Sequence, residues 1–357
     1  MSGLLAALVT CSCTVTPEDR PDQPGATPDG RDLFVETQGD DAGSGNEDEP
    51  WRTVGHALQE LAAGDRLTIG GGVYRERLID VPMPDADEGA PTVVRGAPGE
   101  QPVIQGLLWL EGGSNWVLEG LDVTWDEQTG APHEHMVKVT DGVGWTVRGA
   151  EISGARSYAG MLVAGTGDGE PAAWEVSGNC IRDTAPTNGV NQDHNLYVNT
   201  GLSAGPGRIE GNLLFGAPNG ENLKLGPPGQ EGGAVDVTVR NNTLFRAAQN
   251  LLVSGASSDN LIERNIFGGT GGGVGSIRSF ELTGSGNVAR DNIGFAAATL
   301  LDVPDTAEEG AGLADGGANR FPIDPGFDRV DSCDGFIPSN PEAAGYGHTG
   351  WEDGPEE

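Results

Sequence analysis

The chain of 357 residues has few aromatic residues, few lysines and no long apolar run. Phe, Trp and Tyr supply only 6% of its residues, whereas Gly (59) and Pro (23) are abundant, a balance unlike that of a helical bundle or coiled coil. Only Lys138 and Lys224 are lysines. With 54 acidic and 20 basic residues, the formal charge of −34 repels phosphate backbones and anionic membrane surfaces. We therefore expect no nucleic-acid partner.

Both ends of the chain differ in composition from its middle. Residues 1–13 contain an apolar run from Leu4 to Val9, too short to span a bilayer, and we interpret them as a signal or lipoprotein-like segment. Residues 14–32 are proline-rich and predict a flexible linker, and residues 347–357 form an acidic tail. The sequence thus predicts a protein without a transmembrane span that is secreted, or lipid-anchored at a bacterial cell surface through Cys11 or Cys13.

The other two cysteines, Cys180 and Cys333, lie far apart in the sequence. After export they could form a disulfide, but only if their Cα atoms come within about 7 Å of each other. The sequence leaves that pairing open.

The sequence of residues 33–346 predicts one domain, which begins with a single short helix. Thr53 is a suitable N-cap, and the apolar residues that follow it have helical spacing up to a stop at Gly64, which predicts a helix over residues 53–63. After Asp65 the pattern becomes short β segments separated by Gly or Asn, with no room for crossover helices.

One phrase recurs through these β segments: alternating apolar and polar residues, then Gly or Asn, then a second short strand. Equivalent positions are 23 to 33 residues apart, an irregular spacing that suits a coil with turns of variable length. The repeat predicts a parallel β-solenoid, in which each strand hydrogen-bonds to the coils above and below. One column of the stack is then a ladder of asparagines, namely Asn179, Asn212, Asn242, Asn265 and Asn292. The helix over residues 53–63 is expected to cover the N-terminal end.

Several segments carry a resemblance to a known superfamily. The opening from Leu33 to Asp40, the stretch from Pro50 to Leu58 and the stretch from Gly64 to Glu76 resemble the start of secreted proteins of the pectate-lyase-like superfamily. Asp324 to Phe327, followed by Pro341 to Gly345, resembles their closing segment. The resemblance implies an all-β fold, a right-handed parallel β-helix with a short N-terminal capping helix. It leaves the reaction open, because the superfamily includes lyases, hydrolases, uronan epimerases and proteins without assigned chemistry.

A second column of strands carries the candidate site. In each apolar-x-apolar triplet the outer residues point inward, so the middle residues are expected to face solvent in a line: Lys138, Leu162, Tyr197, Lys224, Leu252 and Glu281. Three positions before each of them lies a second series: His135, Ala159, His194, Glu221, Gln249 and Arg278. Both lysines and two of the five histidines therefore share one surface.

Adjacent coils should place Tyr197 beside Lys224 and His194 beside Glu221. These residue types suit β-elimination from a uronate, with Lys224 or His194 as the base and Tyr197 as the acid. Because the proton removed lies α to a carboxylate, that carboxylate must be neutralised by Ca²⁺ or Arg. Residues predicted to bind the substrate are Arg278, His135, Lys138 and Gln249, and the predicted Ca²⁺ ligands are Asp193 and Glu221.

The sequence therefore predicts a monomeric, exported lyase that acts on an extracellular acidic polysaccharide. One alternative is a non-catalytic surface protein that binds glycans through the same residues. Another is a glycoside hydrolase, with Glu221 and Glu281 as its two carboxylates, or a uronan epimerase.

Overall fold

The computed structural model describes residues 30–130, 134–156, 158–167, 169–185, 193–228, 232–271, 273–302 and 312–350. The predictions for Cys11, Cys13 and most of the 14–32 linker lie outside these ranges. Within the described ranges, no helix has the length and apolar character of a membrane span.

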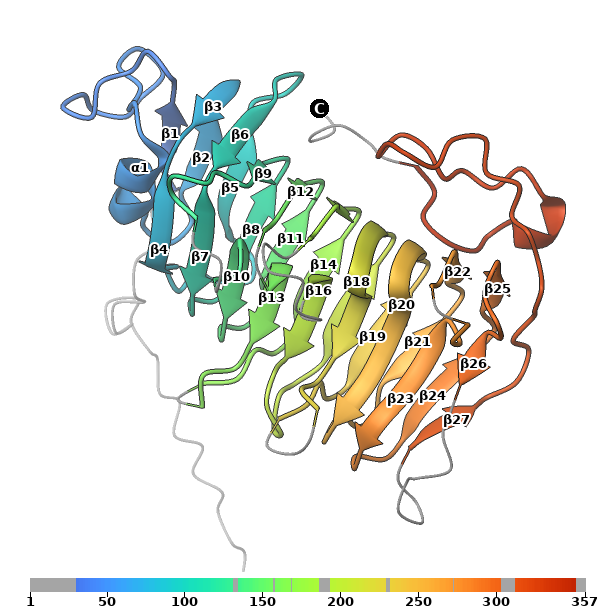
Figure 1. The fold of residues 1–357 in the computed structure, drawn as a ribbon. Coiled ribbons are helices and arrows are strands. Elements are labelled where there is room, and N and C mark those ends of the chain that lie inside the picture. The colour runs from blue at the N-terminus through green and yellow to red at the C-terminus, as the bar shows by residue number, and fades with distance from the viewer. Residues whose placement is uncertain are drawn as a thin grey trace, which may run out of the picture.

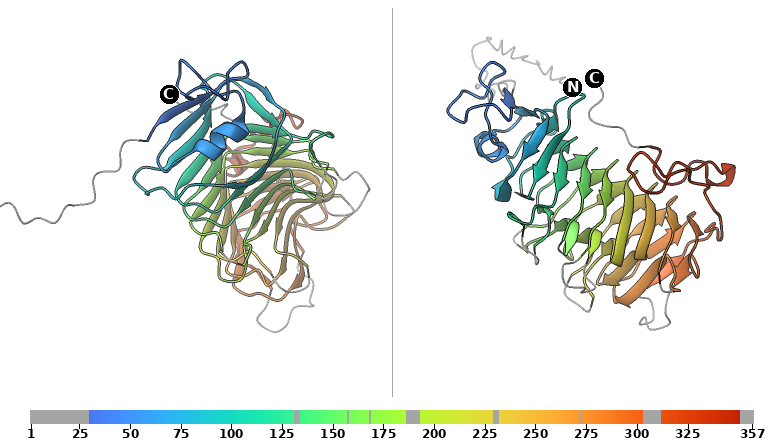
Figure 2. Two further views of the ribbon diagram at one scale, coloured as in Figure 1. Left: turned by 90° about the vertical axis from the view of Figure 1, so that its left-hand side faces the viewer. Right: turned by 45° about the horizontal axis from the view of Figure 1, so that its top comes forward.

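The chain winds as a right-handed parallel β-helix with three faces, and Figures 1 and 2 show its coils stacked from the N-terminal to the C-terminal end. The first face is an 11-stranded sheet. Its strands are β1 (Asp32–Val35), β2 (Arg66–Ile69), β5 (Thr92–Gly96), β8 (Trp116–Glu119), β11 (Thr146–Arg148), β14 (Trp174–Ser177), β17 (Gly207–Glu210), β19 (Val237–Arg240), β21 (Leu261–Glu263), β24 (Asn287–Arg290) and β27 (Leu313–Asp315).

The second and third faces are joined, because two long strands bend from one face to the other. These strands are β18 (Leu213–Leu225) and β20 (Thr243–Gly255), and their pairing has a register shift between Ala217 and Glu221. The second face also contains β3 (Gly72–Tyr74), β6 (Pro102–Gln105), β9 (Asp122–Thr124), β12 (Glu151–Ser153), β15 (Cys180–Arg182), β22 (Ile266–Gly268) and β25 (Ile293–Phe295). The third contains β4 (Arg77–Pro82), β7 (Leu107–Glu111), β10 (Val137–Thr140), β13 (Ala159–Ala164), β16 (His194–Asn199), β23 (Ile277–Leu282) and β26 (Leu301–Asp302).

The predicted asparagine ladder is present at a bend of the coil. Each Asn from 179 to 292 donates a side-chain hydrogen bond to the Asn of the next coil, with N–O distances of 2.9–3.1 Å, and the ladder continues to Asn319, which the repeat did not predict. A second ladder joins Asn195, Asn222 and Asn250, at 2.7 and 2.9 Å. The second ladder lies directly beside the candidate site, and it holds adjacent coils in register there.

The N-terminal end of the stack is covered by α1 (Val54–Glu60), which lies across the first coils (Figure 2). The hydroxyl of the N-cap Thr53 accepts a hydrogen bond from the His56 backbone at 3.3 Å, as predicted. Val54, Ala57 and Leu58 are buried in the main core, so the helix closes the interior. It ends before Leu61, earlier than the expected residue 63.

The C-terminal segment folds back over the outside of the second face (Figure 1). Phe336 packs against Phe215 and Phe245, with ring centroids 4.9 and 5.4 Å apart. Packing continues to His348, which is buried with its Nδ1 3.0 Å from the Thr243 hydroxyl. The segment therefore shields aromatic side chains that the sheet would otherwise expose.

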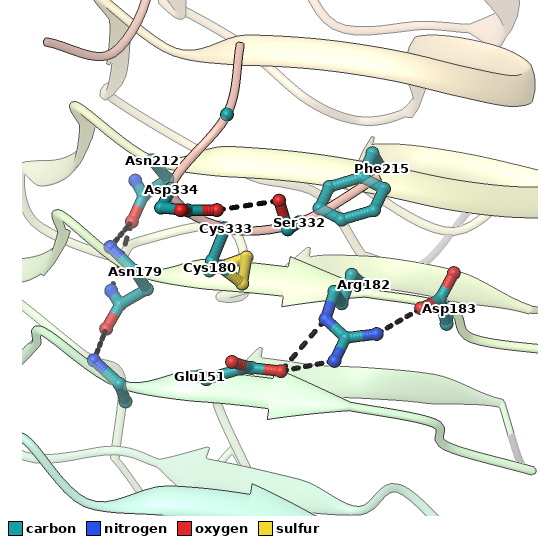
Figure 3. The surroundings of a disulfide bond; sticks show 12 residues. Glu151, Asn179, Cys180, Arg182, Asp183, Asn212, Phe215, Ser332, Cys333 and Asp334 are labelled. Atoms are coloured by element: carbon teal, nitrogen blue, oxygen red, sulfur yellow. Dashed lines mark hydrogen bonds and ion pairs between the residues drawn. A yellow bond between two sulfur atoms is a disulfide. The ribbon is translucent and has the colours of Figure 1, made fainter. Parts of the chain in front are cut away.

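A disulfide joins this segment to the β-helix. Cys180 of β15 and Cys333 are bonded, with their Cα atoms 5.8 Å apart, within the distance that pairing requires (Figure 3). The sequence separation of 153 residues explains why no local pattern could predict the pairing.

We expect removal of this disulfide, in a Cys180→Ala/Cys333→Ala variant, to lower the free energy of unfolding by about 2–4 kcal/mol, because the bond restricts the unfolded chain. Denaturant unfolding of the two proteins measures the difference. Reductant should destabilise the wild type and leave the double variant unchanged. An unfolding midpoint of the wild type that does not respond to reductant would contradict the prediction.

Candidate functional site

The parallel pairing of the third face aligns one outward-facing column of side chains, which we call the ribbon. In order along the stack its members are Trp109, Lys138, Leu162, Tyr197, Lys224, Leu252 and Arg278. The predicted column is thus present from Lys138 to Leu252. Leu162 and Leu252 are only 7% and 6% exposed, however, so they are buried apolar positions between the polar members.

At the C-terminal end of the ribbon the prediction was wrong. Arg278, not Glu281, pairs with Leu252, and Arg278 consequently leaves the second series in which it was placed. In the segment Ile277–Leu282 the apolar-x-apolar triplet is Phe280-Glu281-Leu282, but hydrogen bonding to β20 aligns Ile277, Arg278 and Ser279 with the triplet of the preceding coil instead. Glu281 has a positive φ of 47° next to a register irregularity, which takes it out of the column.

The start of the third face brings His194 and Glu221 together, as predicted. Their side chains are only 4% and 6% exposed, and His194 Nδ1 lies 2.6 Å from Glu221 Oε2. The backbone nitrogen of Glu221 lies 3.4 Å from the same ring nitrogen, a much weaker contact. The shorter contact assigns the hydrogen to Nδ1, which donates to the carboxylate and leaves the lone pair on Nε2.

Lys224 lies on the open side of this pair. Its Nζ is 3.4 Å from His194 Nε2 and 5.2 Å from the centroid of the Tyr197 ring. The rings of His194 and Tyr197 are 5.6 Å apart, so the three predicted catalytic side chains form one cluster. His194 is the most deeply buried of the three, whereas Lys224 and Tyr197 are partly exposed.

Burial sets the protonation of the cluster. It lowers the pKa of His194, because the cost of desolvating an imidazolium exceeds the attraction of Glu221, so the ring is neutral at neutral pH. It also lowers the pKa of Lys224, an effect that the charge of Glu221 opposes. Burial raises the pKa of Tyr197 to about 12, so its hydroxyl remains protonated. The cluster thus holds a lysine that loses its proton more easily than usual beside a stable proton donor.

A groove of about 200 Å³ opens beside Lys224. Its lining residues are His194, Glu221, Lys224, Pro228, Gln249, Leu252, Arg278 and Phe280. The groove therefore contains two of the predicted substrate-binding residues, Gln249 and Arg278. Gln249 Oε1 and Arg278 Nε are buried atoms that have no hydrogen-bond partner among the described residues, so both retain bonding capacity.

The other two predicted substrate-binding residues lie outside the groove, toward the N-terminal end. Lys138 Nζ is 5.0 Å from the centroid of the Trp109 ring. The ring of His135 lies 5.8 Å from that of Tyr158, and burial lowers the pKa of His135 to about 4, so it is neutral above that pH. The predicted column began at Lys138 and did not include Trp109, although Leu108-Trp109-Leu110 has the same triplet pattern.

Asp193 and Glu221, the predicted Ca²⁺ ligands, are on adjacent coils. Asp193 Oδ2 accepts a hydrogen bond of 3.2 Å from the Asn219 backbone, its Oδ1 has no partner among the described residues, and burial raises its pKa to about 6. Glu221 is bonded to His194. Ca²⁺ takes about six to eight oxygen ligands, so these two carboxylates, of which Glu221 already binds His194, do not by themselves form a Ca²⁺ site. In the described ranges no group of three or more His, Cys, Asp or Glu side chains could hold a metal ion. A Ca²⁺ requirement stays a prediction.

Comparisons with known proteins agree with this architecture. No family model matches the chain. A stretch of 74 residues is 38% identical to the uncharacterized protein YwoF of Bacillus subtilis (strain 168), covering 21% of this chain and 15% of YwoF. Among solved structures, a glycoside hydrolase superposes with a TM-score of 0.54 at 9% identity, covering 81% of this chain and 96% of the hydrolase.

Two further solved structures are similar at comparable identity. The complex of XylC with xylose has a TM-score of 0.50 at 10% identity and covers 76% of this chain and 70% of XylC. The pectate lyase Pel9A has a TM-score of 0.48 at 13% identity, with 78% of each chain covered. The chain has the right-handed parallel β-helix fold of pectate-lyase-like proteins. At these identities the likeness concerns the fold, and the chemistry must be argued from the site.

Proposed function

We propose that the protein is an exported enzyme that cleaves a uronate-containing polysaccharide by β-elimination in the groove beside Lys224. The observation that carries the proposal is the position of Lys224. Its ammonium group contacts a neutral imidazole and lies in the same groove as Arg278, and neither cation is paired with a carboxylate among the described residues.

Ion pairs on the first face provide a comparison for the two cations of the groove. On the first face arginines pair with glutamates of neighbouring coils, as Arg148 does with Glu119 at 3.0 Å and Arg290 with Glu263 at 2.9 Å. Among the described residues, Lys224 and Arg278 have no such partner, although the chain has 54 acidic residues. A carboxylate on each sugar unit of the ligand would supply the missing charge.

Each side chain has one role in the proposed reaction. The uronate carboxylate binds Arg278 and accepts a hydrogen bond from the Gln249 amide. Lys224, as the free amine, takes the proton from the carbon α to that carboxylate. The electron pair of the broken C–H bond forms a C=C bond as the glycosidic C–O bond breaks, and the Tyr197 hydroxyl gives its proton to the leaving oxygen. Solvent then takes the extra proton from Lys224 and restores that of Tyr197. His194 and Glu221 also line the groove, but they are bonded to each other, and their proposed role is to position Lys224.

The alternatives differ in what the site must contain. A glycoside hydrolase needs two carboxylates across the groove. Glu221 is bonded to His194, and Glu281 is not among the residues that line the groove, so this pair does not meet that need. An epimerase would abstract the same proton without breaking the C–O bond, and a glycan-binding protein would do neither.

The test is incubation of the protein with polygalacturonate, alginate and other uronic-acid polymers, each with added Ca²⁺ or with EDTA. We expect absorbance from unsaturated sugar ends to rise on at least one polymer, and a neutral polysaccharide to give none. EDTA decides whether Ca²⁺ is needed. The absence of signal on every polymer under both conditions would contradict the proposal, and binding without signal would favour the glycan-binding alternative.

A further inference from the structure

The ribbon has a second polar and aromatic position at its N-terminal end. Trp109 is partly exposed, and its Nε1 donates a hydrogen bond of 2.8 Å to the His135 carbonyl oxygen, which fixes the orientation of the indole. Lys138, the next member of the ribbon, lies over the ring at 5.0 Å. Together these residues offer a flat apolar surface next to a positive charge. A uronate unit is complementary to both, because it has an apolar ring face and a negatively charged carboxylate.

Lys138 keeps its charge available for a ligand. The adjacent carboxylate, Glu134, is engaged by Arg77, whose Nη1 lies 2.8 Å from Glu134 Oε2. No described carboxylate forms an ion pair with Lys138. The second lysine of the chain thus repeats the situation of Lys224: it is a cation on the ribbon that lies beside an aromatic ring and has no acidic partner in the part of the chain that the structure describes.

The two positions are in register along the axis of the β-helix. The pairings Trp109–Lys138, Lys138–Leu162, Leu162–Tyr197 and Tyr197–Lys224 separate Trp109 from Lys224 by four coils. At about 4.8 Å per coil the separation is about 19 Å. Between them the ribbon continues over Leu162 and Tyr197, so an extended chain can follow it from one position to the other.

We infer that Trp109 and Lys138 form a remote binding position for a uronate unit of the same polysaccharide chain that reacts beside Lys224. The inference rests on the proposed function and deepens it, because it requires a polymer long enough to span both positions. The sugar ring stacks on the indole, and its carboxylate pairs with the Lys138 ammonium. Binding should therefore tighten once the ligand exceeds the length that spans the four coils.

Calorimetric titration with uronate oligomers shorter and longer than that span tests the inference. For the wild type we expect the longer oligomers to bind about tenfold more tightly, in line with one aromatic contact and one ion pair. Trp109→Ala and Lys138→Met should bind all oligomers about as weakly as the wild type binds the short ones. Lys138→Met should also reduce the salt dependence of binding, which Trp109→Ala should leave intact. Phe321→Ala, which removes an exposed aromatic ring outside the ribbon, is the matched control.

The outcomes separate this inference from the proposed function. Length-dependent binding that Trp109→Ala abolishes, in a protein that produces no unsaturated ends, would support the remote position and refute the lyase. Elimination combined with equal binding of short and long oligomers, or with binding that Trp109→Ala leaves unchanged, would refute the remote position alone. The absence of binding by every oligomer would refute both.

Discussion

Lys224→Ala is expected to lower kcat on the uronate polymer by about 10²–10⁴-fold, the usual contribution of a general base. The change removes the proposed base and leaves the fold intact, because Lys224 lies on the outer side of β18 while its neighbours Leu223 and Leu225 fill the interior. Rates of formation of unsaturated ends measure the effect. Circular dichroism and the unfolding midpoint should match those of the wild type.

Arg208→Ala is the matched control for this prediction. Arg208 is an exposed cation on the first face, paired with Glu210 at 2.7 Å, and its loss should leave the rate unchanged. A Lys224→Ala variant that retains the wild-type rate would eliminate the proposed site without affecting the fold.

The pH profile distinguishes Lys224 from His194 as the base. If Lys224 acts, activity rises with pH through its pKa, which burial places below the ordinary lysine value. Glu221→Gln removes a charge that raises this pKa, so the rising limb should move to lower pH, while kcat falls because His194 loses its partner. If His194 were the base, the limb would lie below the ordinary histidine range, since burial lowers that pKa.

Asn242→Ala is expected to lower the free energy of unfolding by about 3 kcal/mol or more. Asn242 is fully buried, and its Oδ1 accepts two hydrogen bonds of 2.9 Å from Asn212. Its Nδ2 donates to the Ile209 carbonyl at 2.8 Å and to Asn265 at 3.0 Å. Alanine leaves several of these buried groups unpaired, at a cost of about 1–3 kcal/mol each.

Asn319→Ala tests the same chemistry at the end of the ladder. Asn319 is partly exposed, so water can replace the lost hydrogen bonds and the destabilisation should be clearly smaller. Equilibrium unfolding in denaturant compares the two variants. Equal losses for Asn242→Ala and Asn319→Ala would show that burial does not set the strength of the ladder.

Much of the candidate site could be predicted because a sequence repeat indicates which residues lie next to each other in adjacent coils. Once the recurring phrase defines a coil, residues at equivalent positions of successive coils must stack. Tyr197 therefore meets Lys224 in the structure, as His194 meets Glu221. The same reasoning predicted the asparagine ladder, but it stopped before Asn319, where the phrase is no longer recognisable.

Where the pairing of strands did not follow the local pattern, prediction failed. The apolar-x-apolar triplet of the segment Ile277–Leu282 is Phe280-Glu281-Leu282, but the hydrogen bonds to β20 place Arg278 rather than Glu281 on the ribbon. This difference changes the site, because the ribbon ends on the cation Arg278, which lines the groove, and not on the carboxylate Glu281, which the pattern had predicted.

By itself the amino-acid sequence determined the class of fold, the direction of the ribbon and the pairing of residues one coil apart, because a stacked coil converts a repeat in sequence into contact in space. Only the tertiary structure decided the Cys180–Cys333 bond, the return of the C-terminal segment over the second face and the depth to which His194 and Glu221 are buried. Those features depend on contacts between segments that share no repeat, and on the solvent that such contacts exclude.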